Sequence, residues 1–373
     1  MLKSKRFWIG LGVTIICLYF AFQGIQLDKL AVSFLNMNWL WMPVLILVFM
    51  ISYFGRVFRW QVLFDPYKPG WMHTFHALNV GYFLSNITPA RLGDLARAYL
   101  LGTIEKIPVA RSISTLVVER ALDGLTVVLF MFLLLPFIPN LPSEWVKSGL
   151  LLGAIGVIVL VALAILSLQR ERGVAFLRKL ASPFKFLNRE GLWRFIELLI
   201  DGFSVIRSPR PLIKAILWSL EIWLVVALLA WLTMISLGIH LPFTAGILVQ
   251  VAAALAVTVA PSPGQLGVFH LIAVSVLKLY GVDPNQALAF AFVLHGMTYL
   301  MLMGLGVVSI WREGIDLAKI QDISARNREA DLEALDDQAV PPHASSNGDG
   351  ATSDATAQVQ EDDVEESKPH SGE

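Results

Sequence analysis

Residues 241–269 read LPFTAGILVQVAAALAVTVAPSPGQLGVF and contain no charged side chain. A helix that crosses a bilayer needs about 20 apolar residues, so this stretch by itself indicates a membrane protein. Residues 7–27 and 150–168 are equally free of charge, and 287–311 contain one histidine, His295, and no charged residue. With 56% hydrophobic and 16% charged residues, the chain is too apolar for a soluble protein of 373 residues. We expect an all-α polytopic membrane protein.

Eight apolar segments divide into two kinds. Six have the length and composition of ordinary membrane spans: 7–27, 39–60, 112–138, 148–168, 212–237 and 286–311. The other two, 71–101 and 241–280, are interrupted by proline and glycine, which end a helix. Backbone groups freed by such a break are tolerated at membrane depth only inside protein or beside a wet cavity. These two segments are therefore expected to be broken helices or re-entrant hairpins.

Loop charges predict the orientation. Residues 169–214 carry ten Lys and Arg against four Asp and Glu, whereas each of the loops expected on the other side has at most one Lys or Arg. Basic loops stay in the cytoplasm. Counting spans from this loop also places the N-terminus and the end of the chain in the cytoplasm, in a plasma or inner membrane.

The same counting makes 71–101 enter from the cytoplasm and 241–280 from outside, as in an inverted-topology repeat. The two breaks share a pattern, Pro89-x-Arg91-Leu92-Gly93 and Pro263-x-Gln265-Leu266-Gly267. The simpler alternative is that proline and glycine occur in any helix break.

The net charge of +0 hides two domains of opposite sign. Residues 313–373 hold 16 acidic and 4 basic residues, and residues 1–312 hold the other 13 acidic and 25 basic ones. The segment 313–373 has no hydrophobic period and cannot offset its ordering entropy by burial. We expect a membrane domain over 1–312 and an acidic, mostly disordered cytoplasmic tail over 313–373.

The first break carries Arg91, Asp94 and Arg97 next to a proline. Charges at membrane depth must be paired or face a polar cavity, and an arginine binds phosphate through a planar fork of two donors. An anionic lipid headgroup fits this group of side chains. Alternatively, Asp94 caps the following helix and the arginines reach out to the headgroup layer.

A second charged group, Glu119, Arg120 and Asp123, lies within an apolar span. Glu119 and Asp123 share a helix face, while Arg120 points about 100° away and needs a partner on another segment. The alternative is a position in the first turn, near the cytoplasmic surface. Arg56 and Arg59 close the second span, where we expect them to mark the inner membrane boundary and to be possible headgroup contacts.

The ordered series of these motifs resembles a known family. It comprises Arg56-x-x-Arg59-Trp60, Asn86-x-x-Pro89-x-Arg91-x-Gly93-Asp94-x-x-Arg97, Glu119-Arg120-x-x-Asp123 and Pro261-x-Pro263-Gly264-x-x-Gly267. Such a series, over about residues 7–311, is similar to the flippase-like family, best known as the transmembrane region of lysylphosphatidylglycerol synthase. The resemblance implies a lipid-handling domain, in some members a flippase for an aminoacylated phospholipid. It also implies lipid-binding or transport roles for Asn86, Pro89, Gly93, Pro263, Gly264 and Gly267.

The chain departs from that family in two places. The residues after the last span leave no room for the aminoacyl-transfer domain of the full synthase, so we expect no synthase activity. The second break has Gln265 and His270 where the family pattern has glycine and glutamate, which leaves the lipid headgroup open.

Three functions are compatible with the sequence. The first is a transporter of an anionic or aminoacylated phospholipid, with a site between the two breaks. The others are a non-catalytic membrane subunit of a cell-envelope glycolipid pathway, and an intramembrane lipid transferase with Asp94 or Glu119 as base. The partners expected are membrane lipids and an envelope-biosynthesis enzyme, with no nucleic acid, no metal and no cofactor. No Gly-rich phosphate loop ending in Lys-Ser/Thr is present to couple the protein to ATP.

Overall fold

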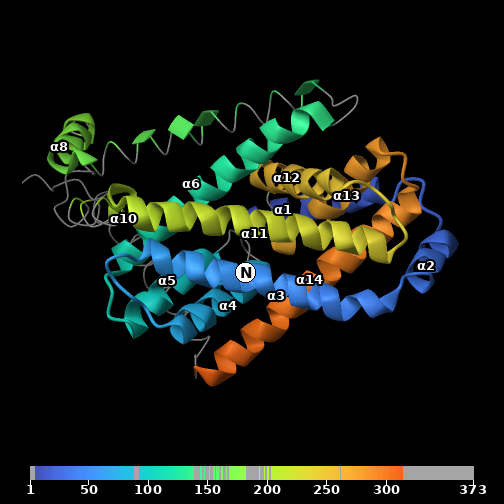
Figure 1. The fold of residues 1–373 in the computed structure, drawn as a ribbon, viewed down its shortest axis with the longest axis horizontal. Coiled ribbons are helices and arrows are strands. Elements are labelled where there is room, and N and C mark those ends of the chain that lie inside the picture. The colour runs from blue at the N-terminus through green and yellow to red at the C-terminus, as the bar shows by residue number, and fades with distance from the viewer. Residues whose placement is uncertain are drawn as a thin grey trace, which may run out of the picture. The chain divides into compact units, whose positions relative to one another are not determined.

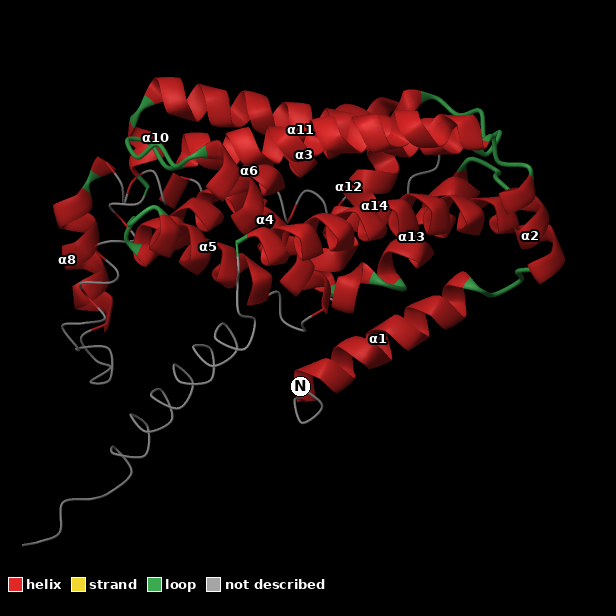
Figure 2. Ribbon diagram, turned by 90° about the horizontal axis from the view of Figure 1, so that it is seen from below, coloured by secondary structure: helices red, strands yellow, loops and turns green. Residues whose placement is uncertain are grey.

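The computed structural model describes residues 5–87, 92–137, 168–181, 203–260 and 262–313, and scattered positions within 143–165 and 193–200. The described residues form helices joined by loops, without a strand (Figure 2). They belong to one unit, Met1–Asp316. Among them, four helices are long and apolar enough to cross a membrane. The expected all-α membrane architecture is confirmed.

The helices follow one another along the chain as labelled in Figure 1. Their bounds are α1 (Lys5–Ala21), α2 (Leu27–Leu35), η1 (Trp39–Trp41), α3 (Met42–Leu63), α4 (Trp71–Ile87), α5 (Leu92–Ile104), α6 (Val109–Leu134), η3 (Leu135–Phe137), α8 (Arg170–Ala181), α10 (Ser204–Arg207), α11 (Pro209–Ser236), α12 (Phe243–Val259), η5 (Pro263–Gln265), α13 (Val268–Leu279) and α14 (Pro284–Arg312).

Four of the six predicted full spans are confirmed as α3, α6, α11 and α14. The first predicted span differs, because α1 ends at Ala21 and a separate helix, α2, follows. Gly24 has a φ of 77°, a left-handed conformation that glycine adopts readily and that turns the chain there. The predicted span 148–168 falls mostly, and the predicted tail 313–373 almost wholly, outside the described residues.

An antiparallel pair of long helices, α3 and α11, forms one face of the domain (Figure 1). The amide of Asn38 donates to the carbonyl of Ser236 over 2.8 Å, and the rings of Phe58 and Trp218 lie 5.3 Å apart. The end of α3 therefore lies beside the start of α11. We call this the basic end of the domain, because Lys68, Arg210, Lys214 and Arg312 lie there.

The first broken segment is an antiparallel hairpin of α4 and α5 that starts at the basic end. A Cβ atom on Gly81 would stand 2.8 Å from the Cβ of Arg97, and one on Gly93 would stand 2.6 Å from the amide of Ser85. The two helices pack this closely because both glycines lack a side chain.

The second broken segment, α12 and α13, starts at the opposite end, after the end of α11. Thr244 near the start of α12 lies beside Tyr280 after the end of α13, so the chain again returns to the side it left. Gly264 and Gly267 turn the backbone between them with φ values of 57° and 81°. The hairpins enter from opposite ends, and the second break meets the end of α4: a Cβ on Gly264 would stand 3.5 Å from the carbonyl oxygen of Asn86.

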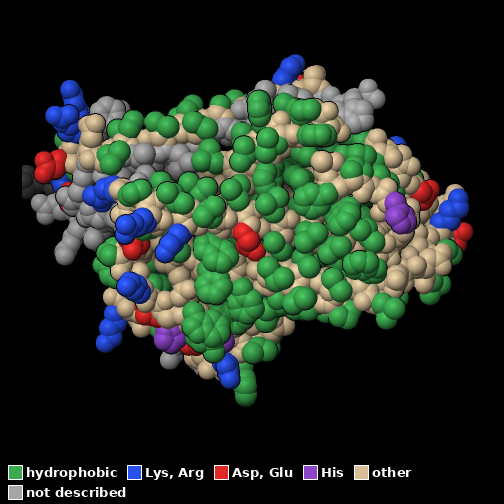
Figure 3. Space-filling model, viewed as in Figure 1, with side chains coloured by type: hydrophobic (Ala, Val, Ile, Leu, Met, Phe, Trp, Pro, Cys, Tyr) green, Lys and Arg blue, Asp and Glu red, His purple; other side chains and the backbone are tan. Residues whose placement is uncertain are grey.

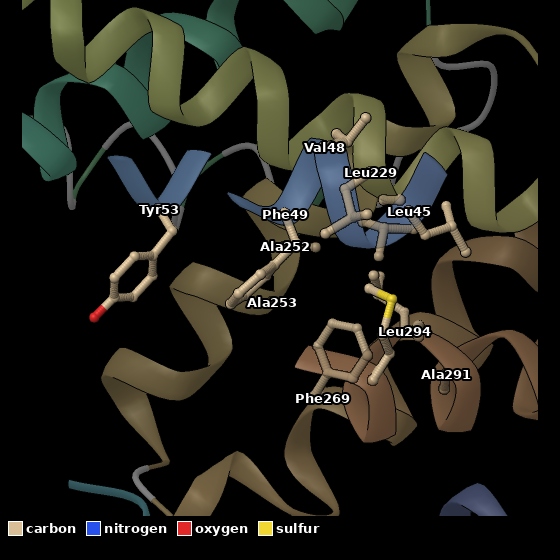
Figure 4. Packing of buried hydrophobic residues seen from close by; sticks show 14 of the residues in the cluster. Leu45, Val48, Phe49, Tyr53, Leu229, Ala252, Ala253, Phe269, Ala291 and Leu294 are labelled. Carbon is tan, nitrogen blue, oxygen red and sulfur yellow. The ribbon is translucent and has the colours of Figure 1, made fainter. Parts of the chain in front are cut away.

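The apolar core lies where α3 and α11 meet the second hairpin and α14. Figure 4 shows its packing, in which the labelled residues are Leu45, Val48, Phe49, Tyr53, Leu229, Ala252, Ala253, Phe269, Ala291 and Leu294. Three of these are alanines, and small residues let membrane helices approach each other closely. The core therefore holds the second hairpin against the long helices.

Replacing Gly93 with alanine should push apart the two helices of the first hairpin, α4 and α5. The new Cβ would overlap the carbonyl oxygen of Gly81, and overpacking of this kind costs about 1–3 kcal/mol. The matched control is Gly124→Ala, because a Cβ at Gly124 has no neighbour within 4 Å. We expect a lower melting temperature in detergent for the Gly93 variant alone, and equal melting of both variants would contradict the close packing.

Candidate functional site

Six charged side chains from three helices form one cluster beside the first hairpin. We call Arg59, Asp94, Arg97, Glu119, Arg120 and Asp123 the charged cluster. It contains three guanidinium groups and three carboxylates, so it is formally neutral. Pairing of this kind is what charges inside a membrane domain require.

Glu119 lies at the centre of the charged cluster. Its Oε1 atom is 2.9 Å from Nη2 of Arg97, 3.4 Å from Nη2 of Arg59 and 3.4 Å from Nη2 of Arg120. Only 3% of the Glu119 side chain and 1% of the Arg97 side chain are exposed. Glu119 lies ten residues after the start of α6, about 15 Å along the helix. It is therefore well beyond the first turn.

Asp123 extends the cluster toward α11. Its Oδ1 atom is 2.5 Å from Nη1 of Arg59 and accepts a 3.3 Å hydrogen bond from the indole of Trp223. Arg59 also donates to the hydroxyl of Ser219 over 3.2 Å. The end of α3 is thus tied by polar contacts to both α6 and α11.

The cluster reaches the surface of the protein at Asp94 and Arg120. The Asp94 carboxylate lies 3.1 Å from Arg97 and 3.2 Å from Arg120. The Arg120 side chain is 47% exposed, unlike the buried Arg59 and Arg97. Arg120 is therefore the guanidinium of the cluster with most freedom to meet a ligand.

Aromatic rings enclose the buried side of Arg97. Its guanidinium lies 4.8 Å from the ring centre of Trp60 and 5.9 Å from that of Tyr82. Such contacts stabilise a cation that is removed from water. Trp60 is fixed in turn by a 2.9 Å hydrogen bond from its indole to Thr115.

The structure gathers several of the sequence-predicted residues but places them differently. Arg120 finds its partner on another segment, Asp94, as expected. Arg59 belongs to the charged cluster and is not exposed at a membrane boundary. The guanidinium of Arg56 lies 3.5 Å from the hydroxyl of Tyr82. Gly93 lies in the close contact between α4 and α5. Pro89 and Arg91 lie outside the described residues.

Three buried polar atoms without a partner lie on residues at or near the contact between Asn86 and the second break. Buried side-chain atoms of Asn86, Ser262 and His270 have no hydrogen-bond partner among the described residues. His295 bonds to the backbone of Gly264 and lies 5.1 Å, ring centre to ring centre, from His270. Unsatisfied buried polar groups are costly, so this region offers hydrogen bonds to a polar ligand or to water.

Gly264, beside Pro263, lies near Asn86 at the end of α4, whereas Gly267 lies against α1. A Cβ on Gly267 would stand 2.6 Å from the carbonyl oxygen of Thr14 in α1. Gly267 thus allows α1 to pack against the start of α13. No group of three potential metal ligands occurs among the described residues.

Sequence reasoning missed the contribution of α11 to the charged cluster. Ser219 and Trp223 are four residues apart and share one helix face toward Arg59 and Asp123. A pair of hydrogen-bonding side chains at this spacing in an apolar span was the available signal. Helix spacing does not reveal which other helix such a face meets.

Both hairpins and the charged cluster fall within a segment that is shared with known proteins. Residues 7–306 match the family described as the lysylphosphatidylglycerol synthase TM region. The chain belongs to this family. The resemblance inferred from the four motifs is thereby confirmed, and most of the membrane domain is covered by it.

Several archaeal membrane proteins are similar to this chain. A UPF0104 membrane protein of Methanothermobacter thermautotrophicus is 24% identical over 257 residues, which are 65% of this chain and 75% of the relative. One from Methanocaldococcus jannaschii is 21% identical over 238 residues, 61% of this chain and 93% of the relative. One from Pyrococcus horikoshii is 23% identical over 313 residues, 77% and 90%. No solved structure matches the chain significantly.

Removing the charge of Glu119 should destabilise the domain, because Arg59, Arg97 and Arg120 all contact this carboxylate. Breaking a buried ion pair costs about 3–5 kcal/mol, so Glu119→Gln should lower the yield of folded protein and its melting temperature. The control is Glu144→Gln, since the Glu144 and Lys147 side chains are 77% and 73% exposed. Unchanged melting of the Glu119 variant would show that the cluster does not stabilise the fold.

Proposed function

We propose that this protein is a lipid transporter, a flippase that moves an anionic or aminoacylated phospholipid between the leaflets of the cell membrane. The observation that carries the proposal is the meeting of the two hairpins, Asn86 against Gly264, after entry from opposite ends. Transporters built from inverted repeats bind their substrates where such broken helices meet, near the midplane. A headgroup at this point could be reached from either side of the membrane.

Two groups of side chains support a polar headgroup as the transported part. The unpartnered atoms of Asn86, Ser262 and His270 surround the junction. The charged cluster follows within about two turns of α5, with Arg120 turned outward. We assign the phosphate of the lipid to Arg91 and Arg120, because a guanidinium holds two phosphate oxygens at once.

The neutral pairing within the charged cluster limits how tightly the lipid is held. Arg120 already contacts Asp94 and Glu119, so a phosphate must compete with these carboxylates. Competition of this kind favours release over very tight binding, which is what a transporter requires. The energy source would be the gradient of the lipid itself, and an envelope-biosynthesis enzyme that makes the lipid would be the partner.

The proposed orientation places the basic end in the cytoplasm, as its excess of Lys and Arg favours. Single cysteines in a Cys17→Ser background test it, with Lys68→Cys at the basic end and His240→Cys at the opposite end, both exposed. In intact cells an impermeant thiol reagent should label the His240 variant alone, and both should react after lysis. Labelling of the Lys68 variant in intact cells would reverse the orientation.

Transport should depend on the paired guanidinium donors of Arg91 and on the negative charge of Asp94. In liposomes with fluorescent phosphatidylglycerol, we expect Arg91→Lys and Asp94→Asn each to slow leaflet exchange about tenfold, the effect of about 1.4 kcal/mol. An ammonium cannot reproduce the guanidinium fork, and an amide leaves Arg97 and Arg120 without one carboxylate.

The control for this experiment is Arg178→Lys on α8, a conservative change in an exposed ion pair with Glu197. Rates are normalised to folded protein, and aminoacylated phosphatidylglycerol is compared as a second substrate. If both test variants exchanged lipid between the leaflets at the wild-type rate, the proposed headgroup site would be contradicted. Formation of a new lipid product would favour the transferase alternative.

A further inference from the structure

A hollow of about 710 Å³ lies at the basic end, between the loop after α3 and the start of α11. Three cationic side chains line it, Lys68, Arg210 and Lys214, together with one acidic side chain, Asp65. The three cations are exposed and form no ion pair with another described residue. The mouth of this hollow is therefore electropositive.

A second hollow of about 590 Å³ continues from the first along the helices. The two share Gln61, Val62 and Lys214 in their walls. Beyond the shared residues the lining becomes apolar, with Phe58 from α3 and Leu217 and Trp218 from α11. Together the hollows form one passage, which we call the α3–α11 groove.

The spacing of the lining residues explains this groove. On α11, Lys214, Leu217, Trp218 and Glu221 follow the i, i+3, i+4, i+7 pattern of a single helix face. Phe58, Gln61 and Val62 make the same kind of stripe on α3. Figure 3 shows the face in question, with Lys and Arg gathered near the start of α11 and hydrophobic side chains over α3 and α11.

The length of α11 places the groove relative to the bilayer. Its 28 residues make a helix about 42 Å long, and the hydrocarbon layer is about 30 Å thick. If the excess is shared by both ends, the backbone of Lys214 lies at the edge of the hydrocarbon layer, from which its long side chain reaches the lipid phosphates. Glu221, seven residues on, lies about 10 Å deeper.

Glu221 closes the deep end of the groove. Its Oε2 atom is buried and packs against Gly55 of α3, where a Cβ would overlap it. The carboxylate thus points into the helix pair, where the positive charge of Arg56 acts on it. The groove has a cationic mouth, an apolar middle and a closed floor.

We propose that the α3–α11 groove is a binding site for an anionic phospholipid of the leaflet at the basic end. The phosphate lies among Lys68, Arg210 and Lys214, and one acyl chain lies along Phe58, Leu217 and Trp218. Each part of the lipid then meets a surface of matching chemistry at the depth where the bilayer already holds it. The acidic segment 313–373 could pair with the mouth, but it has no apolar run to fill the middle of the groove.

This site is separate from the proposed transport site. Arg59 and Ser219 turn toward the charged cluster, whereas Phe58 and Trp218 are the adjacent residues on each helix, about 100° round. The helix pair therefore separates the groove from the charged cluster. A lipid in the groove does not need to be transported.

Photolabelling of the full-length protein tests the site. The protein is placed in phosphatidylcholine vesicles that contain one tenth phosphatidylglycerol with a diazirine in its acyl chain, and labelled peptides are mapped by mass spectrometry. We expect label on the peptides with Phe58 and Trp218. Arg210→Gln and Lys214→Gln should each reduce it about fivefold, since a basic residue near the surface contributes about 1 kcal/mol to binding an anionic lipid.

The matched control is Lys278→Gln in the last turn of α13, near the opposite end. Label spread evenly over exposed helices, or equal label from a phosphatidylcholine probe, would overturn the proposal because it would show bulk lipid contact. Carbodiimide cross-links from Lys214 to residues 313–373 in these vesicles would also overturn it in favour of the tail. Specific label with no leaflet exchange would leave the groove standing and reject the proposed transport.

Discussion

One carboxylate, Glu119, holds the charged cluster together. It is in contact with three guanidinium groups, which come from the end of α3, from α5 and from its own helix, α6. Inside a membrane domain each unpaired charge would cost about 2.5–3.5 kcal/mol on insertion scales, so the loss of one of these residues destabilises the others. The mutual dependence fixes how α5, α3 and α6 pack, and it fixes the first hairpin in turn.

The position of that hairpin then determines where the proposed lipid substrate would enter. Gly81 and Gly93 bring α4 close to α5, and Asn86 near the end of α4 lies beside Gly264 of the second hairpin. Polar backbone and side-chain groups at such a junction have no helix to satisfy them. A site that offers unsatisfied hydrogen bonds and a nearby neutral ion network can receive a charged headgroup by exchange of partners, without a permanent net charge in the membrane.

Much of this architecture could be predicted from the sequence, because span length and proline or glycine breaks are local signals. Four spans and both breaks follow from residues close together in the chain. The position of Arg59 could not be predicted, since its pairing with Asp123 and Ser219 joins residues 64 and 160 positions apart. Charge alone cannot distinguish an arginine at a boundary from one inside an ion network.

The pair α3 and α11 has a different chemistry on each of two neighbouring faces. One face carries Arg59 and Ser219 toward the charged cluster, and the next carries Phe58 and Trp218 along the groove. Because each helix is rigid, a rotation that moves one face must move the other. A lipid bound in the proposed groove site would therefore resist rotation of α3 and help to keep Arg59 within reach of Glu119. Occupancy of the proposed groove site and integrity of the charged cluster would then be linked through this helix pair, without direct contact between the two sites.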